Sequence, residues 1–124
     1  GQQQVDELLQ RTNRMMENTD RISSPDFSMA TRCREVGSNT KYVSMVINAT
    51  YNKNFKTLLN ERRVREAARQ LSAPGPHNSA TIQQLAFSLG YSSSTSFIIA
   101  FKKVMGMTPT VYRRLANERK EHVG

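Results

Sequence analysis

The chain has 124 residues, 37% of them hydrophobic and 7% aromatic, with no tryptophan and a formal net charge of +8 at pH 7. This length suits one compact domain, or two very small ones that share an element, and the composition excludes a large aromatic core. The positive charge favours a polyanionic partner, either nucleic acid or an anionic membrane, although a generic basic surface would carry the same charge.

Cys33 is the only cysteine, which excludes an internal disulfide and leaves a metal cluster short of ligands. We expect a buried, inert thiol in a reducing compartment. The sequence contains no signal peptide and no run of about 18 apolar residues that could span a bilayer.

Residues 3–19 form the first predicted element, an amphipathic helix with apolar side chains at helical spacing. The run Ser23-Ser24-Pro25 ends it, so residues 1–25 are predicted as a helix and linker before the main domain. This helix can be the end of a connection from an absent upstream domain. Alternatively, Leu8, Leu9 and Met15 pack on the domain that follows, as most amphipathic helices do.

The rest of the chain shows no alternating strand pattern of useful length, so the predicted fold is all-α. A loop at residues 72–78 divides it into two halves. When the two halves are aligned, residues at matched positions have the same physical roles. Cys33 falls on Ala86, Gly37 on Gly90 and Val43 on Phe97. This is a divergent internal repeat with one extra residue in the second turn.

Each copy of the repeat has the pattern of a helix, a short turn with glycine and a second helix. Side chains that can cap helix starts, and glycines that can end a helix in left-handed conformation, recur at matched places. The predicted capping residues are Ser28, Gly37, Asn39, Thr81, Gly90 and Ser93, and Gln84 completes a capping box with Thr81. The pattern predicts two helix-turn-helix units, at 26–53 and 79–116, joined by a linking helix at 54–71 and followed by a flexible tail at 117–124.

The second helix of each unit has a core face and an opposite, exposed face. On a helical wheel, Phe97, Ala100, Phe101 and Val104 lie within roughly 60° of Phe97 and are predicted to face the core. The matching core residues of the first unit are Val43, Val46, Ile47 and Thr50. The opposite faces carry Lys41, Ser44, Met45 and Asn48 in the first unit, and Thr95, Ile98, Ile99 and Lys102 in the second.

In a helix-turn-helix protein the exposed face of the second helix enters the DNA major groove. There, lysine can donate to guanine, asparagine can pair with adenine, and apolar side chains can pack on thymine methyl groups. The predicted base-contacting residues are Lys41, Ser44, Met45, Asn48, Ser94, Thr95, Ile98, Ile99 and Lys102. An alternative for Ile98 or Ile99 is contact with a neighbouring domain, because exposed isoleucines cost solubility unless something covers them.

Phosphate contacts are predicted at helix starts, whose free backbone N–H groups attract anions, and at cationic side chains. No Asp or Glu occurs between Glu66 and Glu118, so that span is almost purely cationic. The predicted phosphate-contacting residues are Ser28, Asn39, Thr40, Arg62, Arg65, Thr81, Ser93 and Lys103. For Arg62 and Arg65, as for Arg69, a solvated helix face is an equal alternative.

The stretch TIQQLAFSLGYSSSTSFIIAFKKVMGMTPTVYRRL, residues 81–115, resembles the C-terminal signature of AraC/XylS-type transcriptional regulators. Its matching motifs are Ile82, Leu85-Ala86, Gly90-Tyr91, Phe97, Phe101-Lys102-Lys103, Gly106-Met107-Thr108-Pro109 and Tyr112-Arg113. Residues 54–71 resemble the linking helix of that family through Arg63, Ala67 and Leu71, and the resemblance extends over residues 26–116. Asn52 in place of glycine, Cys33 in place of alanine and the Ile98-Ile99 pair depart from the family pattern.

The resemblance implies about seven helices and two recognition helices in successive major-groove segments of double-stranded DNA. The function that it implies is sequence-specific DNA binding by a bacterial transcription activator. It further implies an upstream sensor domain in the parent protein, contact of the full-length protein with RNA polymerase, and a cytoplasmic, nucleoid-associated location. No cofactor, metal, small-molecule ligand or membrane contact is expected for this domain.

Two other classes of function have weaker support in the sequence. An enzyme is not expected, because His77 and His122 lie in a loop and a tail and no carboxylate pair shares an apolar face. The main alternative is a protein- or membrane-interaction module that uses Ile98, Ile99 and the lysines as a basic amphipathic surface. The polar residues on the equivalent face of the first unit argue against it.

Overall fold

The computed structural model describes residues 1–28, 33–34, 39–73 and 79–123. Within those ranges every regular element is a helix, which confirms the predicted all-α fold. The helices are α1 (Gln2–Glu17), α2 (Thr19–Ile22), α4 (Thr40–Tyr51), α5 (Phe55–Ser72), α6 (Ile82–Ser88), α7 (Ser94–Met105) and α8 (Pro109–Val123). The predicted first helix of the first unit, with its terminal Gly37, lies outside the described residues except for Cys33 and Arg34.

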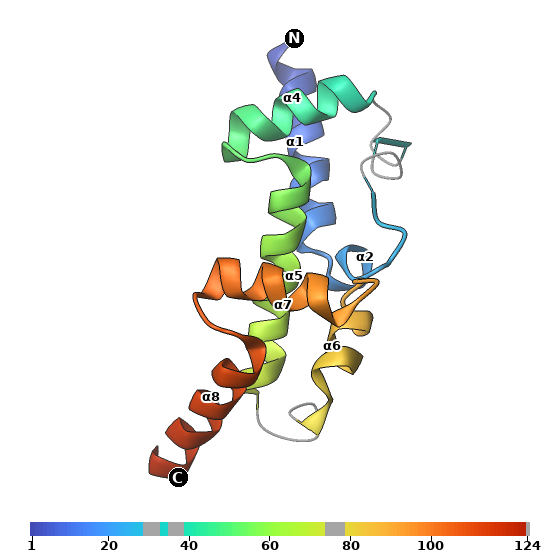
Figure 1. The fold of residues 1–124 in the computed structure, drawn as a ribbon. Helices are drawn as coiled ribbons and strands as arrows, with labels where there is room; N and C mark the ends of the chain where they lie inside the picture. Colours follow the sequence, from blue (N-terminus) through green and yellow to red (C-terminus); the bar gives the residue numbers. More distant parts are fainter. Residues whose placement is uncertain (29–32, 35–38, 74–78, 124) are drawn as a thin grey trace.

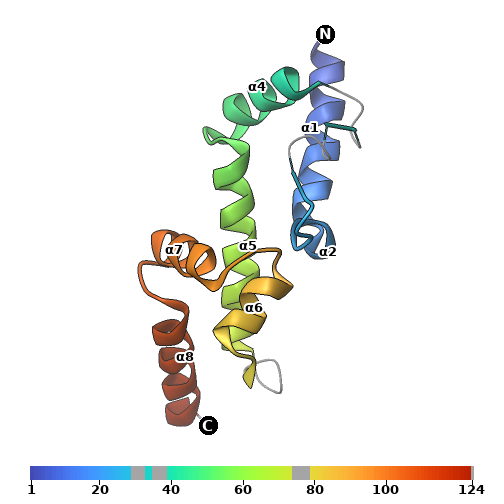
Figure 2. The ribbon, with the colours of Figure 1, turned by 45° about the vertical axis from the view of Figure 1, so that its right-hand side comes forward.

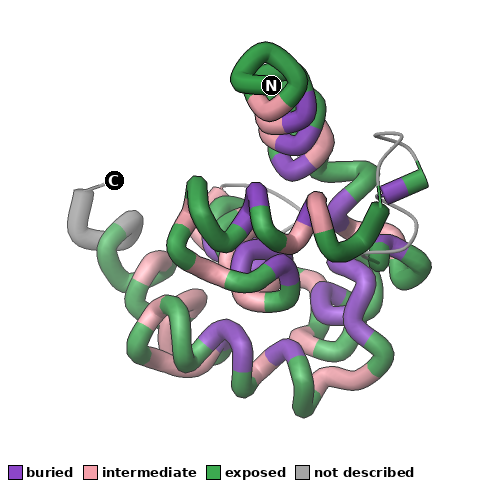
Figure 3. Tube along the Cα trace, turned by 90° about the horizontal axis from the view of Figure 1, so that it is seen from above, coloured by how far each residue is buried: buried purple, intermediate pink, exposed green. Residues whose placement is uncertain are grey.

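The long helix α5 forms the axis of the molecule and joins its two halves (Figure 1). Helices α1, α2 and α4 pack around its first half, and α6, α7 and α8 pack around its second half (Figure 2). Helices α4 and α7 cross the front of the view in Figure 1, one above the other, and run in the same direction. Helix α1 lies behind them, so one side of the molecule presents both second helices of the repeat (Figure 3).

Side-chain hydrogen bonds at the helix starts confirm three of the predicted N-caps. Asn39 Oδ1 accepts from the backbone N–H three residues on at 2.8 Å, and Ser93 Oγ does the same at 3.2 Å. Thr81 Oγ1 accepts from the Gln84 N–H at 3.0 Å, and Gln84 Oε1 accepts from the Thr81 N–H at 2.9 Å. This reciprocal pair is the predicted capping box.

Left-handed residues end the helices of the repeat at matched places. Gly90 has φ +94°, which confirms its predicted role after α6. Asn52 closes α4 with φ 55°, and Gly106 closes α7 with φ 78°. Asparagine therefore serves where the family pattern has glycine, since its short polar side chain tolerates this conformation better than most residues do.

Two buried clusters form the core, and α5 contributes to both of them. The first cluster combines residues of α1, α4 and the first half of α5, and it includes the buried Cys33. The second combines residues of α6, α7 and the second half of α5. Buried and exposed positions therefore alternate around α1, α4 and α7 (Figure 3). Two small cores with a shared element are what the length of the chain allows.

Helix α1 is part of the first core. Leu8 and Met16 are buried in it, while Leu9 and Met15 pack against it from the edge. This helix therefore packs on the domain that follows, while a connection to an upstream domain stays a prediction. The first predicted helix ends earlier than expected, because Asn18 interrupts it in extended conformation and caps the short α2.

Two predicted core positions are wrong. The Val104 side chain is 37% exposed, and Thr50 is exposed as well. Both lie on the predicted face but in the last turn of their helices, where the adjacent residues Tyr51 and Met105 pack against the core instead. Ile98, in contrast, was predicted to be exposed and is half-buried against the second core. It lies only about 100° from Phe97 on the helical wheel, at the edge of the core face.

The expected flexible tail over residues 117–124 is helical as far as Val123, as the last part of α8. No proline or glycine interrupts the sequence from Thr110 to Val123. Arg114 and Glu118 form an ion pair at 3.9 Å, four residues apart, which is the spacing that supports a helix.

Candidate nucleic-acid interface

The exposed face of α4 carries the residues predicted to read bases in the first unit. Lys41 and Asn48 are exposed, Ser44 is half-buried, and Met45 is 58% exposed. The Asn39 cap fixes the start of this helix and Asn52 fixes its end. The face therefore has hydrogen-bonding groups on both sides of one apolar side chain.

The exposed face of α7 is the counterpart in the second unit. Thr95 and Lys102 are exposed, Ser94 and Ile98 are half-buried, and Ile99 is 64% exposed. The structure thus separates the two isoleucines, since Ile98 packs on the core and Ile99 does not. Helices α4 and α7, which carry these two faces, lie on one side of the molecule at different heights along α5 (Figure 1).

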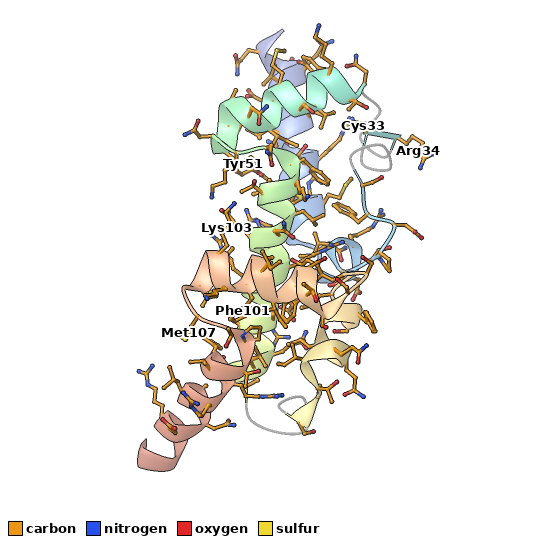
Figure 4. All side chains as sticks on the ribbon, in the orientation of Figure 1. Cys33, Arg34, Tyr51, Phe101, Lys103 and Met107 are labelled. Carbon is orange, nitrogen blue, oxygen red and sulfur yellow. The ribbon has the colours of Figure 1, made fainter. Side chains whose placement is uncertain are left out.

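Of the residues at helix starts that were predicted to contact phosphates, some cap their own helix with the side chain and others are exposed to solvent. The side chains of Asn39, Thr81 and Ser93 cap their own helices. Thr40 and Ser28 are exposed, but the helix that Ser28 was predicted to cap lies outside the described residues. Lys103 is exposed in the last turn of α7, on the side nearer α4, whereas Phe101 lies on the side nearer α8 (Figure 4).

Arg62 and Arg65 lie away from both reading faces. They line a pocket of about 290 Å³ between α5 and the segment where α1 meets α2, together with Met16, Ile22 and Arg69. Arg69 is committed to Glu66, with Arg69 Nη2 donating to Glu66 Oε1 at 2.6 Å, and this bond lowers the pKa of the Glu66 carboxyl. Because α1 lies on the side opposite α7, these arginines are not brought together with the residues of α4 and α7.

Arg63 is the buried charge that sequence reasoning did not assign. Its side chain is 7% exposed, and burial lowers the pKa of its guanidinium. Nε donates to the Ile22 carbonyl at 2.6 Å, and Nη2 donates to the Ser24 carbonyl at 3.0 Å. The guanidinium carbon lies 5.1 Å from the centre of the Tyr91 ring. One side chain on α5 therefore contacts both the segment after α2 and the turn of the second unit.

The turn of the second unit, at Gly90 and Tyr91, packs closely against Arg63. A Cβ atom on Gly90 would lie 2.6 Å from Arg63 Nη2 and 2.8 Å from the Ser23 carbonyl oxygen, so only glycine fits. Tyr91 donates its hydroxyl to Asn60 Oδ1 at 2.8 Å, and burial raises the pKa of that hydroxyl to about 12. A sequence signal existed: Arg63 lies four and eight residues before Ala67 and Leu71, on the buried face of the linking helix.

Other kinds of site have no basis in the part of the chain that is described. No group of three or more His, Cys, Asp or Glu residues there could hold a metal ion. Among the same residues, no helix is both long and apolar enough to cross a membrane.

A pair of capped helices, presented on one side of a shared helix, defines the class of double helix-turn-helix DNA-binding domains. The family model described as helix-turn-helix domain matches residues 32–115. The chain therefore belongs to the helix-turn-helix family of AraC-type transcription regulators, as the sequence resemblance predicted. This family consists of DNA-binding regulators and not of enzymes.

Similar proteins agree with this assignment. An AraC-like transcription regulator of Streptomyces lividans is 42% identical over 52 residues, which are 42% of this chain and 16% of that protein. The C-terminal domain of AraT, a response regulator from Geobacillus stearothermophilus, is 25% identical, with a TM-score of 0.72 over 88% of this chain and 84% of that one. The DNA-binding domain of AdpA, solved in complex with a target DNA, shares the fold with a TM-score of 0.77 at 17% identity, over 92% of this chain and 96% of that one.

Proposed function

We propose that this domain reads double-stranded DNA by inserting α4 and α7 into successive major-groove segments, as part of a bacterial transcription activator. The proposal is supported by the exposed residues at matched positions of α4 and α7 and by the placement of both helices on one side of the molecule (Figure 1). The 18 residues of α5 span about 27 Å, which suits two reading helices separated by one DNA turn of about 34 Å.

Each exposed side chain has a role that its chemistry supports. Lys41 donates to guanine O6 and N7, and Asn48 pairs with the edge of adenine. Ser44, Ser94, Thr95 and Lys102 supply further hydrogen bonds to base edges. Of the two isoleucines, Ile99 has the exposure that a base contact needs, while Ile98 supports it from the edge of the core.

Contacts to the DNA backbone complete the proposed interface. Lys103 and Thr40 reach phosphates beside the two helices, and the capped helix starts at Asn39, Thr81 and Ser93, with Ser28, offer backbone N–H groups to phosphate oxygens. A phosphate contact by Arg62 or Arg65 would require DNA that wraps toward α1 and α2. These two arginines are therefore the weaker part of the predicted set.

The chain spans about a sixth of the length of the Streptomyces relative, for which the matched share is 16%. We therefore place this domain in a longer parent protein with a sensor domain upstream of α1. In that protein, DNA binding would recruit RNA polymerase in the cytoplasm.

The proposal is tested by selection of tight-binding duplexes from a random DNA pool at about 0.15 M salt, where non-specific phosphate attraction is weakened. The expected result is a bipartite motif with its two parts about 10 base pairs apart. Lys41→Ala should relax the preference at one base pair of one part and cost about 1–3 kcal/mol. A pool without any enriched sequence, with stronger binding to anionic vesicles, would contradict the proposal and support the interaction-module alternative.

A further inference from the structure

Met45 and Ile99 occupy the same place in the two repeats. Each is the sixth residue after the N-cap of its helix and the seventh before the left-handed residue that closes it. The two helices also have equal lengths of 12 residues. The two side chains therefore have the same position relative to the backbone of their units.

These two side chains are also the most exposed large hydrophobic residues in the described part of the chain. Neither belongs to a core cluster or packs against one, whereas the neighbouring Ile98 does. Exposed aliphatic surface is unfavourable in water, and its burial is favourable. Since neither side chain contributes to a core, packing within the domain does not explain why these two positions carry hydrophobic residues.

The surroundings of each side chain limit what can cover it. One turn before Met45 and Ile99 lie Lys41 and Thr95, and nearly one turn after them lie Asn48 and Lys102, all of them exposed. Each apolar side chain is thus a single small patch between hydrogen-bonding groups. A membrane or an apolar protein surface would leave the flanking polar side chains without hydrogen-bond partners, whereas the edge of a base provides such partners.

In the major groove, the C5-methyl group of thymine is the apolar feature of the base edges. We propose that Met45 and Ile99 are a matched pair of methyl readers, each of which packs on the C5-methyl group of one thymine in its own half of a bipartite site. This inference rests on the proposed function and adds the base feature that both units recognise.

The arrangement of the helices fixes the relation between the two thymines. Helices α4 and α7 run in the same direction across the molecule, so the half-sites form a direct repeat and not a palindrome (Figure 1). The two thymines therefore lie on the same strand, about 10 base pairs apart. The readers differ in stiffness, because isoleucine is branched at Cβ and methionine is flexible, so Ile99 should tolerate displacement of the methyl group less well.

The test uses the bipartite duplex obtained by selection, with deoxyuridine replacing one thymine at a time. This replacement removes only the methyl group. At the two proposed positions the wild-type domain should lose about fourfold in affinity, the factor that corresponds to burial of one methyl group. Replacement of the same thymine by cytosine should weaken binding, and 5-methylcytosine should recover part of that loss.

Variants assign each methyl group to its reader. Met45→Ala should bind thymine and deoxyuridine equally in the first half-site and keep the fourfold preference in the second, and Ile99→Ala should show the reverse. Val104→Ala is the matched control, because Val104 is an exposed aliphatic residue of α7 on a different face, and it should keep both preferences. Far-UV circular dichroism should give the same melting temperature for Met45→Ala and Ile99→Ala as for the wild type.

The possible outcomes separate the two claims. A bipartite site with no effect of deoxyuridine at any thymine, or alanine variants that keep the thymine preference, would overturn the methyl readers and leave DNA reading by both units in place. A palindromic site would overturn the shared direction of the half-sites. If no duplex is enriched, the proposed function and this inference fail together.

Discussion

The buried face of α4 in the first unit is aliphatic, whereas the buried face of α7 in the second unit is aromatic. Val43, Val46 and Ile47 fill the first. Phe27 and Phe55 lie beside them with ring centres 5.8 Å apart, and Tyr42 and Tyr51 pack on the edge of this core. In the second unit, four rings follow one another from Tyr91 through Phe97 and Phe101 to Tyr112, with successive centres 5.4, 5.8 and 5.5 Å apart.

The units also differ in the helix that completes each core. In the first unit it is α1, which precedes the unit, and in the second it is α8, which begins within the unit at Pro109. A helix-turn-helix unit therefore requires apolar residues at fixed positions and an additional covering helix. It requires neither a particular apolar side chain nor a fixed place in the chain for the covering helix.

The largest difference between the units should appear when equivalent core residues are truncated. Phe101→Ala is expected to lower the free energy of unfolding by about 3–5 kcal/mol, because Phe101 is fully buried and contacts two other rings. Ile47→Ala, at the equivalent position, should cost less within the range of about 2–5 kcal/mol. Urea unfolding followed by circular dichroism measures both, and an equal or larger loss in Ile47→Ala would remove the distinction.

The two glycines of the second unit should respond differently to a methyl group. Gly90→Ala combines left-handed strain of about 1–2 kcal/mol with overpacking against Arg63 of about 1–3 kcal/mol. Gly106→Ala meets open space, so only the strain of about 1–2 kcal/mol remains. The same unfolding experiment compares them, and equal losses would show that Arg63 yields to the added methyl group.

Tyr91 has no tyrosine counterpart in the first repeat, where Gly37 is followed by Ser38. Tyr91→Phe should lower the free energy of unfolding by about 1 kcal/mol at pH 7, because the hydrogen bond to Asn60 is lost.

The same variant should change the response to alkaline pH. Burial raises the pKa of Tyr91 to about 12 in the folded state, above the value of about 10 in an unfolded chain. The neutral hydroxyl therefore stabilises the fold fully below about pH 10, and this contribution is lost as the pH rises toward 12. The difference in unfolding free energy between wild type and Tyr91→Phe should shrink over that interval, and a constant difference would argue against the shifted pKa.

The smallest effect is expected where the units are most alike. Asn52→Gly should leave the free energy of unfolding within about 0.5 kcal/mol, since glycine relieves left-handed strain but costs chain entropy. Asn52→Ala is the control, and it should lose about 1–2 kcal/mol. If Asn52→Gly were as damaging as Asn52→Ala, the asparagine side chain would have a role beyond its backbone conformation.

Local rules in the sequence predicted much of this fold. Caps such as Asn39 and Thr81 act within three residues, so their spacing alone predicts where α4 and α6 begin. Helical period identified the faces of α4 and α7, but it does not tell which residues near the edge of a face a neighbouring segment covers. For that reason the exposure of Thr50 and Val104 and the partial burial of Ile98 were not predicted.

Local rules could not predict contacts between segments that are far apart in the sequence. Arg63 could be placed on the buried face of the linking helix, but its acceptors lie 41 and 39 residues away in the chain. No periodicity encodes that distance. In the candidate site, the reading residues follow from helix faces, whereas the position of Arg62 and Arg65 on the α1 side depends on where a separate helix packs.

Helix α5 belongs to both cores at once. Its first half gives Phe55, Leu58 and Leu59 to one cluster, and its second half gives Val64, Ala67, Ala68 and Leu71 to the other. Cleavage within α5 by a protease would therefore disrupt the helix that both units share. Neither fragment would then keep a complete hydrophobic core. Although the architecture is a duplication, it cannot be divided back into two self-sufficient halves, and in a calorimeter it should melt as a single transition.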